Sequence, residues 1–196
     1  MEKPTPRIIS SDGHRVLSHE GDGRYFDPIV SIASFDFTEG GSVEVEFLLL
    51  LNRDDRQRIT LCLDSGSGEW EAGARILEEV SLLEAQPGGQ SICVTYPNGE
   101  LDLRRPDEMT LRLGALVVSD RILVAPSMGS GAWTSLALQL GPDGTVEIFV
   151  DHVLVHTSRW KALFDADARW RVVIAGAAVD TQLLLRNLTV TRGARF

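Results

Sequence analysis

Alternation of apolar and polar residues with a period of two is the feature that most constrains the fold of this chain. Residues 41–47, 58–63 and 91–96 all alternate in this way, and stretches rich in Gly, Pro, Asn and Asp separate segments of this kind. Successive side chains of an extended strand point to opposite faces, so each segment has one apolar and one polar face. The pattern predicts short β-strands that cover one core from two sides.

The clearest local unit is a β-hairpin. Residues 135–140 and 146–150 alternate, and the turn sequence Gly141-Pro142-Asp143-Gly144 separates them. Asp151-His152 predicts a second tight turn before a strand at 153–155. Glycine is the usual residue where such a turn needs a positive φ, and His152 stands there instead.

The end of the chain predicts two more strands, at 170–175 and 183–190. Helical and strand-like spacing compete over Ala74 to Ala85, where apolar residues gather on one side and glutamates largely on the other. A short helix there would leave the class unchanged. The fold class predicted is all-β, an antiparallel β-sandwich with at most one short helix.

Length and composition indicate one ordinary folded unit. The 196 residues fit a single sandwich domain, 1–196, and 43% hydrophobic with 24% charged residues is typical of a globular protein. The net charge of −9 argues against nucleic acid, which requires clustered Lys and Arg, and against anionic lipid. We expect a neutral, cationic or protein ligand.

The sequence predicts no membrane insertion by this chain. Residues 1–7 are charged and Pro-containing with no signal-type apolar segment behind them, and no apolar run reaches membrane-spanning length. We expect a cytoplasmic location if the chain is complete, and an extracytoplasmic one if it is cut from a longer membrane-anchored protein.

The two cysteines, Cys62 and Cys93, both lie in strand-like segments and could be neighbours in a sheet. Disulfide-dependent scaffolds usually carry more cysteines than two. We therefore expect two buried free thiols.

The second half of the chain resembles the concanavalin A-like lectin/glucanase superfamily, specifically its laminin G-like jelly rolls. The segments that carry the resemblance are residues 133–138, the turn at Asp143-Gly144, residues 146–151 and the closing residues 185–190. Residues 41–47 look like an early strand of the same sandwich. The resemblance implies a jelly-roll β-sandwich with a ligand on the concave sheet or at the rim. Members include lectins, carbohydrate-binding modules, adhesion domains, glucanases and bacterial sensory domains.

The glucanases of this superfamily carry catalytic carboxylates in a Glu-x-Asp-x-Glu pattern on one strand. This chain has Glu44-Val45-Glu46, and position 48 is Leu, so the third carboxylate is missing. Two glutamates at i and i+2 on a solvated outer face are a simpler interpretation. We expect no catalytic residues and no enzyme activity.

The sequence contains no pattern that is typical of a metal-binding site. A rim calcium ion is implied by the laminin G-like relatives, but the loop 64–69 lacks the dense acidic spacing of a calcium loop, and Asp143 is explained by its turn. The histidines lack the spacing of a zinc site. They are His14 and His19, near Glu20 and Asp22, and the pair His152 and His156. We expect no cofactor.

Aromatic side chains are the candidate ligand-binding residues. Trp70 lies among Gly and Glu residues that offer no apolar packing, Tyr96 ends a predicted strand, and Phe149 alternates out of phase with the apolar face of its strand. The other tryptophans, Trp133, Trp160 and Trp170, border strands and fit packing roles.

The predicted core contains Leu136, Leu138, Val146, Ile148, Leu188 and Val190. Two functions fit the pattern: a non-catalytic carbohydrate- or ligand-binding module, and a protein-interaction or sensory domain of a bacterial signalling or surface protein. A glycoside hydrolase is the weaker alternative. A row of exposed aromatics would favour sugar, and an apolar patch with a polar rim would favour a protein partner.

Overall fold

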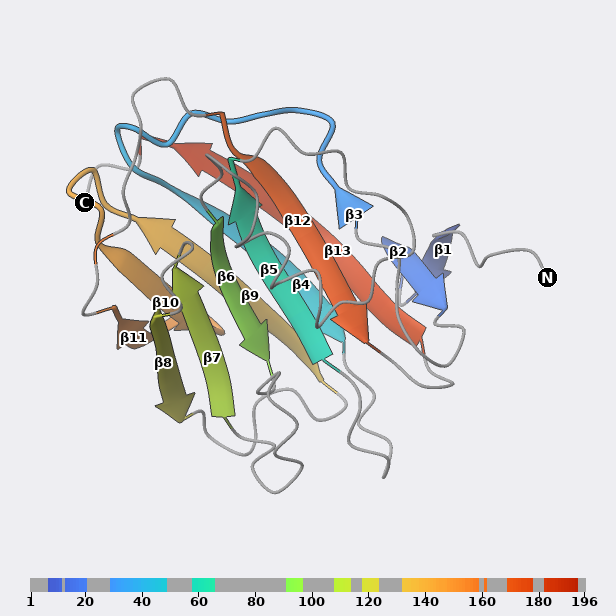
Figure 1. Ribbon diagram of the computed structural model, residues 1–196. Helices are drawn as coiled ribbons and strands as arrows, with labels where there is room; N and C mark the ends of the chain where they lie inside the picture. The colour runs from blue at the N-terminus through green and yellow to red at the C-terminus, as the bar shows by residue number, and fades with distance from the viewer. Residues whose placement is uncertain are drawn as a thin grey trace.

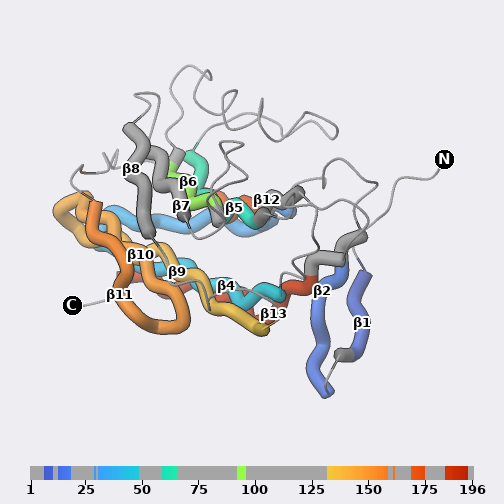
Figure 2. Tube along the Cα trace, turned by 90° about the horizontal axis from the view of Figure 1, so that it is seen from below, coloured from blue at the N-terminus to red at the C-terminus, as the bar shows by residue number. Residues whose placement is uncertain are grey.

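The chain folds as an all-β sandwich. The structure is a computed structural model that describes residues 7–11, 13–20, 29–48, 58–65, 91–96, 108–113, 118–123, 132–158, 161, 169–177 and 182–193. Every regular element in these residues is a β-strand, and two sheets lie face to face (Figure 1; Figure 2). All strand pairings are antiparallel, as predicted for a jelly-roll sandwich.

One sheet has seven strands, and its neighbours come from distant parts of the chain. In spatial order they are β1 (Arg7–Ser11), β2 (His14–Glu20), β13 (Gln182–Arg192), β4 (Gly41–Leu48), β9 (Trp133–Leu140), β10 (Val146–Val150) and β11 (Val153–Thr157). The predicted hairpin is confirmed as β9 and β10. Strand β4 lies between β13 and β9, so the middle of this sheet joins the early, central and final parts of the sequence.

The other sheet has six strands. In spatial order they are β3 (Ile29–Val30), β12 (Arg171–Ala177), β5 (Arg58–Asp64), β6 (Ser91–Tyr96), β7 (Glu108–Leu113) and β8 (Val118–Leu123). Strands β5, β6 and β12 confirm three of the predicted segments. The segment Ala74 to Ala85, where helix and strand competed, lies outside the described residues.

Alternate residues of both sheets fill the space between them. Strand β4 is buried at every second position, and Val43, Val45 and Phe47 are 0–1% exposed. The core side chains of largest volume are Trp170, Phe37, Phe47, Ile59, Leu61, Leu63, Ile92, Leu136, Leu138 and Leu140. This is the dry interior that the period-two pattern predicts, and Trp170 takes the packing role expected of it.

The predicted core is right at five positions and wrong at Leu188. Leu136, Leu138, Val146 and Ile148 are buried and Val190 packs partly buried against them, whereas Leu188 is 48% exposed. The cause is a register shift between β13 and β4, where Arg186 pairs with Glu46 but Thr189 pairs with Glu44. One extra residue in β13 reverses the alternation and turns Leu188 outward.

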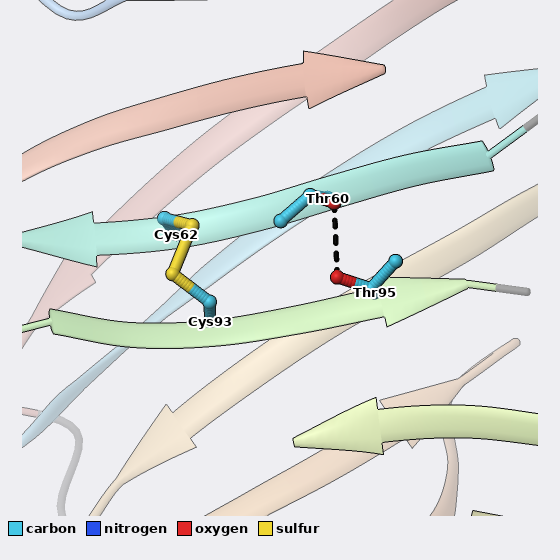
Figure 3. Close-up of a disulfide and its surroundings, with 4 residues drawn as sticks. All are labelled: Thr60, Cys62, Cys93 and Thr95. Carbon is cyan, nitrogen blue, oxygen red and sulfur yellow. Dashed lines mark hydrogen bonds between the residues drawn. A yellow bond between two sulfur atoms is a disulfide. The ribbon is translucent and has the colours of Figure 1, made fainter. Parts of the chain in front are cut away.

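The expectation of two free thiols is also wrong. Cys62 on β5 and Cys93 on β6 are directly opposite each other, with their Cα atoms 4.2 Å apart, and they form a disulfide (Figure 3). On the same face the hydroxyls of Thr60 and Thr95 share a hydrogen bond of 2.9 Å (Figure 3). Sequence alone did not show which strands pair, so it could not bring these cysteines together.

Central strands of the six-stranded sheet are buried on both faces. On β5, Ile59 and Leu61 face the sandwich interior, yet Thr60, Cys62 and Asp64 on the opposite face are only 1–3% exposed. The outer face of these strands therefore offers no open surface. The outer face of the seven-stranded sheet differs, because every second residue of β4, β9 and β10 there is partly accessible, apart from the buried Ser135.

The core assignment can be tested with a matched pair of truncations. Leu138→Ala removes a fully buried side chain and should lower the free energy of unfolding by about 2–5 kcal/mol. Leu188→Ala makes the same chemical change at the half-exposed bulge and should cost less than about 0.5 kcal/mol. Urea denaturation measures both. Equal losses would return Leu188 to the core.

The disulfide should stabilise the fold by restricting the unfolded chain. It joins residues 31 positions apart, so the chain-entropy relation predicts a loss of about 3–4 kcal/mol on its removal. The measurement is urea denaturation of the native protein and of the Cys62→Ala/Cys93→Ala variant, each with and without reductant. Reductant should destabilise only the native protein. Two thiols that react with an alkylating agent in unfolded, unreduced protein would contradict the pairing.

Candidate functional site

A polar cluster lies on the outer face of the seven-stranded sheet, where β13, β4 and β9 run side by side (Figure 2). Glu46 of β4 pairs in register with Ser135 of β9 on one side and with Arg186 of β13 on the other. Glu44 points to the same face, two residues along β4. Because the intervening Val45 is buried, the positions of both carboxylates follow from the core.

Glu46 is held by two donors from β13. The Nε of Arg186 donates to its Oε2 at 2.6 Å, and the Nδ2 of Asn187 donates to its Oε1 at 2.8 Å. The Arg186 guanidinium carbon also lies 4.0 Å from the centre of the Trp133 ring, a cation–π contact. The cluster thereby locks a carboxylate, a guanidinium, an amide and an indole into one arrangement.

These contacts lower the pKa of Glu46. The hydrogen bond from Asn187 has the largest effect, the hydrogen bond and charge of Arg186 and the nearby His152 act in the same direction, and partial burial opposes them. The Glu46 side chain is 25% exposed. Both glutamates lie partly exposed on the outer face, as expected, and Glu46 is in addition a structured, ionised acceptor there.

Glu44 joins the turn between β10 and β11. Its Oε1 accepts a hydrogen bond from the hydroxyl of Ser135 and lies 3.4 Å from the Nδ1 of His152. Asp151 anchors the same turn to β9, because its Oδ1 accepts from the Ser135 amide and its own amide donates to the Ser135 carbonyl, both at 2.9 Å. The His152 side chain is 78% exposed beside these groups.

Residues with unusual backbone conformations occur at this cluster. Among the described residues, the non-glycine positions with positive φ are Asp151 (49°), His152 (62°) and Asn187 (52°). The first two form the tight turn that the sequence predicts, of the type with positive φ at both central residues. Asn187 sits within the bulge of β13. The side chains of all three take part in the cluster, and sparsely populated backbone conformations of this kind collect at functional sites.

Apolar side chains border the polar cluster. Phe149 of β10 pairs in register with Ala137 of β9, and Ala137 pairs with Glu44, so Phe149 lies two strands from that carboxylate on the outer face. On its other side Phe149 pairs with Leu154, which is 48% exposed. Two strand spacings are about 10 Å. The face thus offers an apolar platform beside hydrogen-bonding groups.

Of the three candidate aromatics, the structure describes the side chain of Phe149. Phe149 lies on the outer face of the seven-stranded sheet, partly accessible, as its alternation predicts. Tyr96 ends β6 in the other sheet, and its side chain lies outside the described part of the chain, as does all of Trp70. Phe149 is therefore the candidate aromatic that lies on the same face of the sheet as the polar cluster.

Besides the turn residue Asp151, five residues of the cluster were missed as site residues. Trp133 was assigned to packing, and Ser135, Arg186 and Asn187 drew no attention because strand residues of these types are common. His152 carried a usable signal, since the turn sequence placed a histidine where glycine is expected. The other four become recognisable only once β13, β4 and β9 are paired.

No cluster of three or more His, Cys, Asp or Glu residues suited to a metal ion occurs among the described residues. Asp64, in the loop whose spacing does not fit a calcium loop, ends β5 with a buried side chain 3.6 Å from Arg171. Asp143 accepts hydrogen bonds from Lys161 and Thr145, which lower its pKa. His14 is exposed on β2. The expectation of no cofactor stays a prediction, and a rim calcium ion rests on the resemblance alone.

Within the described residues there is no helix with the length and apolar character needed to cross a membrane.

No family model and no curated protein matches the sequence. Solved structures do match, and they show that the fold is the concanavalin A-like jelly roll. A Bacillus subtilis protein of unknown function with a galectin-like fold matches with a TM-score of 0.67 at 12% identity, covering 96% of this chain and 87% of its own. The carbohydrate recognition domain of Emp46p matches with a TM-score of 0.67 at 12% identity over 97% and 88%. A family 16 endo-glucanase from Bacteroides ovatus has a TM-score of 0.63 at 12% identity over 94% and 84%.

The lowered pKa of Glu46 makes a prediction about stability and pH. A carboxyl whose pKa is lower in the folded state stabilises the fold above its usual value of 4.5, and this contribution is lost as pH falls through the lowered pKa. Glu46→Gln removes the titrating group. The free energy of unfolding of the native protein should exceed that of the variant at pH 6–7, and the difference should shrink steadily below about pH 4.5.

Chemical denaturation between pH 3 and pH 7 measures this difference. Asp36, held by the Thr38 amide and hydroxyl, and Asp143, held by Lys161, also have lowered pKa values, but they are present in both proteins and cancel. A difference independent of pH would mean that the contacts with Asn187 and Arg186 do not lower the pKa of Glu46.

Proposed function

We propose that the chain is a non-catalytic carbohydrate-binding module whose site is the polar cluster and Phe149 on the outer face of the seven-stranded sheet. The observation that carries the proposal is the convergence of Asp151, His152 and Asn187 on Glu44, Ser135 and Glu46, all three with strained backbones. Their contacts with the cluster explain why residues other than glycine occupy these positions. A structural turn and bulge would accept glycine at less cost.

The chemistry of the face suits a sugar. A pyranose ring has apolar C–H faces, which pack on aromatic rings, and hydroxyl groups, which need directed donors and acceptors. Phe149 and Leu154 supply the apolar contact, and Glu44 and His152 supply polar groups on the same face. Because these groups stand on strands with buried neighbours, they are positioned before a ligand arrives.

Proteins of the same fold support this direction. The Emp46p domain is named a carbohydrate recognition domain, and the B. ovatus protein is named an endo-glucanase. Sugar-binding proteins and sugar-cleaving enzymes thus share this architecture, and the site must decide between them.

The state of Glu46 favours binding over hydrolysis. A glycosidase needs one protonated carboxyl as general acid, usually with a raised pKa, beside a second carboxylate. Here the pKa of Glu46 is lowered by Asn187 and Arg186, and its two oxygens are already occupied by these donors. We therefore assign Glu44 and Glu46 to recognition and positioning.

A protein-interaction domain is the second candidate, favoured by one observation. Val153 and Leu154, adjacent on the edge strand β11, are 57% and 48% exposed. Exposed apolar residues on a sheet edge are typical of protein contacts. Failure of every glycan on a broad panel to bind would favour this alternative. Trp70 and Tyr96 stay predicted contacts for either ligand.

Truncation of the apolar platform tests the proposed site. Phe149→Ala should weaken binding of any glycan selected from a neutral and acidic oligosaccharide panel by about tenfold or more, because the ring is the central apolar contact. Isothermal titration calorimetry measures affinity, and a thermal melt checks the fold. The matched control is Ile8→Ala, which truncates an exposed apolar residue of β1 at the opposite edge of the same sheet. Equal affinity in both variants would place the sugar elsewhere.

Relief of backbone strain provides a second test, because fold and function should respond in opposite directions. His152→Gly places glycine at a position with φ of 62°, so the melting temperature should stay level or rise. The same change removes the imidazole beside Glu44 and should weaken glycan binding several-fold. A variant that loses stability and keeps full affinity would show that His152 serves the fold alone.

A further inference from the structure

We infer that this face selects neutral glycans and excludes acidic ones such as uronic acids and sulfated sugars. The inference rests on the proposed function and adds the charge class of the ligand. It starts from the carboxylates that three parts of the sheet present together. Glu44 and Glu46 come from β4, Glu147 from the outer face of β10, and Asp151 from the turn that follows β10.

The two basic side chains of the cluster already contact two of these carboxylates, those of Glu46 and Glu44. Arg186 donates its Nε to Glu46 and lies over Trp133, and His152 lies 3.4 Å from Glu44. Four carboxylates and one guanidinium leave these residues with a formal charge of −3 when His152 is neutral. The chain as a whole carries −9, which adds to the repulsion.

Ionised carboxylates accept hydrogen bonds and donate none. Sugar hydroxyls are donors and suit Glu44, whereas a ligand carboxylate or sulfate would face an acceptor of its own charge. Recognition of an anionic sugar normally uses a guanidinium or ammonium group free to pair with it. The charge of Arg186 is already paired with the Glu46 carboxylate at 2.6 Å, and its side chain is only 19% exposed over Trp133, so an anionic sugar would meet a guanidinium whose charge is already balanced.

The first experiment is a panel of immobilised oligosaccharides at low ionic strength. It contains neutral gluco-, xylo-, manno- and galacto-oligosaccharides, and also oligogalacturonates, oligoalginates and sulfated oligosaccharides. The expected result is that every glycan retained is neutral. Retention of acidic glycans, alone or as strongly as neutral ones, would overturn the inference and leave the proposed function standing. Retention of none would overturn the proposed function itself.

A charge variant tests the cause. Glu147 contacts Thr157 through a 3.4 Å hydrogen bond and takes no part in the contacts around Glu44 and Glu46. Glu147→Lys should therefore raise affinity for trigalacturonate at least fivefold, with the gain lost in high salt, and change affinity for the retained neutral glycan by a smaller factor. The control is Glu39→Lys, an equal change of net charge on the exposed turn before β4.

Calorimetric titrations of the three proteins decide the outcome, and thermal melts confirm that each is folded. A gain for trigalacturonate in Glu147→Lys but not in Glu39→Lys supports selection by the charge of this face. An equal gain in both variants would show that the net charge of the whole chain, and not the charge of this face, excludes acidic sugars. No gain in either variant would show that acidic sugars are excluded by shape, and the inference would then fail.

Discussion

The two-residue periodicity of β4 is the constraint on which the rest of the structure depends. Val43, Val45 and Phe47 fill the interior between the sheets, so Glu44 and Glu46 must face outward. A slip of one residue would bury two carboxylates and expose three apolar side chains, which the fold cannot tolerate. The energy of the core therefore holds the register of the site, and β4 is paired on both sides by strands that carry the remaining groups.

The bulge in β13 is where this regular pattern is interrupted. The extra residue between Arg186 and Thr189 leaves the Leu188 side chain exposed, so its apolar surface is not buried in the core. Asn187, in the same bulge, has a φ of 52°. In return, consecutive residues of one strand, Arg186 and Asn187, both reach Glu46. In a regular strand, consecutive side chains point to opposite faces and could not share one carboxylate. The bulge therefore makes the Glu46 arrangement possible.

The sequence predicts the structural features that depend on a local residue pattern, and it misses the features that depend on which strands pair. Strand β4 and the hairpin of β9 and β10 are confirmed because alternation and turn residues are local signals. The disulfide was missed because its formation depends on β5 lying beside β6, and Leu188 was misplaced because an added residue is invisible to a period-two pattern. The outward position of Phe149 also follows from its phase in the strand. Arg186 and Glu46 are 140 residues apart, and no spacing in the sequence relates them.

His152 combines a local signal in the sequence with a contact that depends on strand pairing. The turn after β10 needs positive φ at both central positions, which asparagine and glycine meet at low cost, and a chain shaped only by stability has no reason to place a histidine there. The imidazole does not pack in the core, since it is 78% exposed, and its Nδ1 lies 3.4 Å from the carboxylate of Glu44. At His152 the positive φ accompanies a position beside Glu44 on the outer face. Asn187 lies across the sheet and, as an asparagine, adopts positive φ at lower cost, and there too the backbone conformation and the contact with Glu46 occur together.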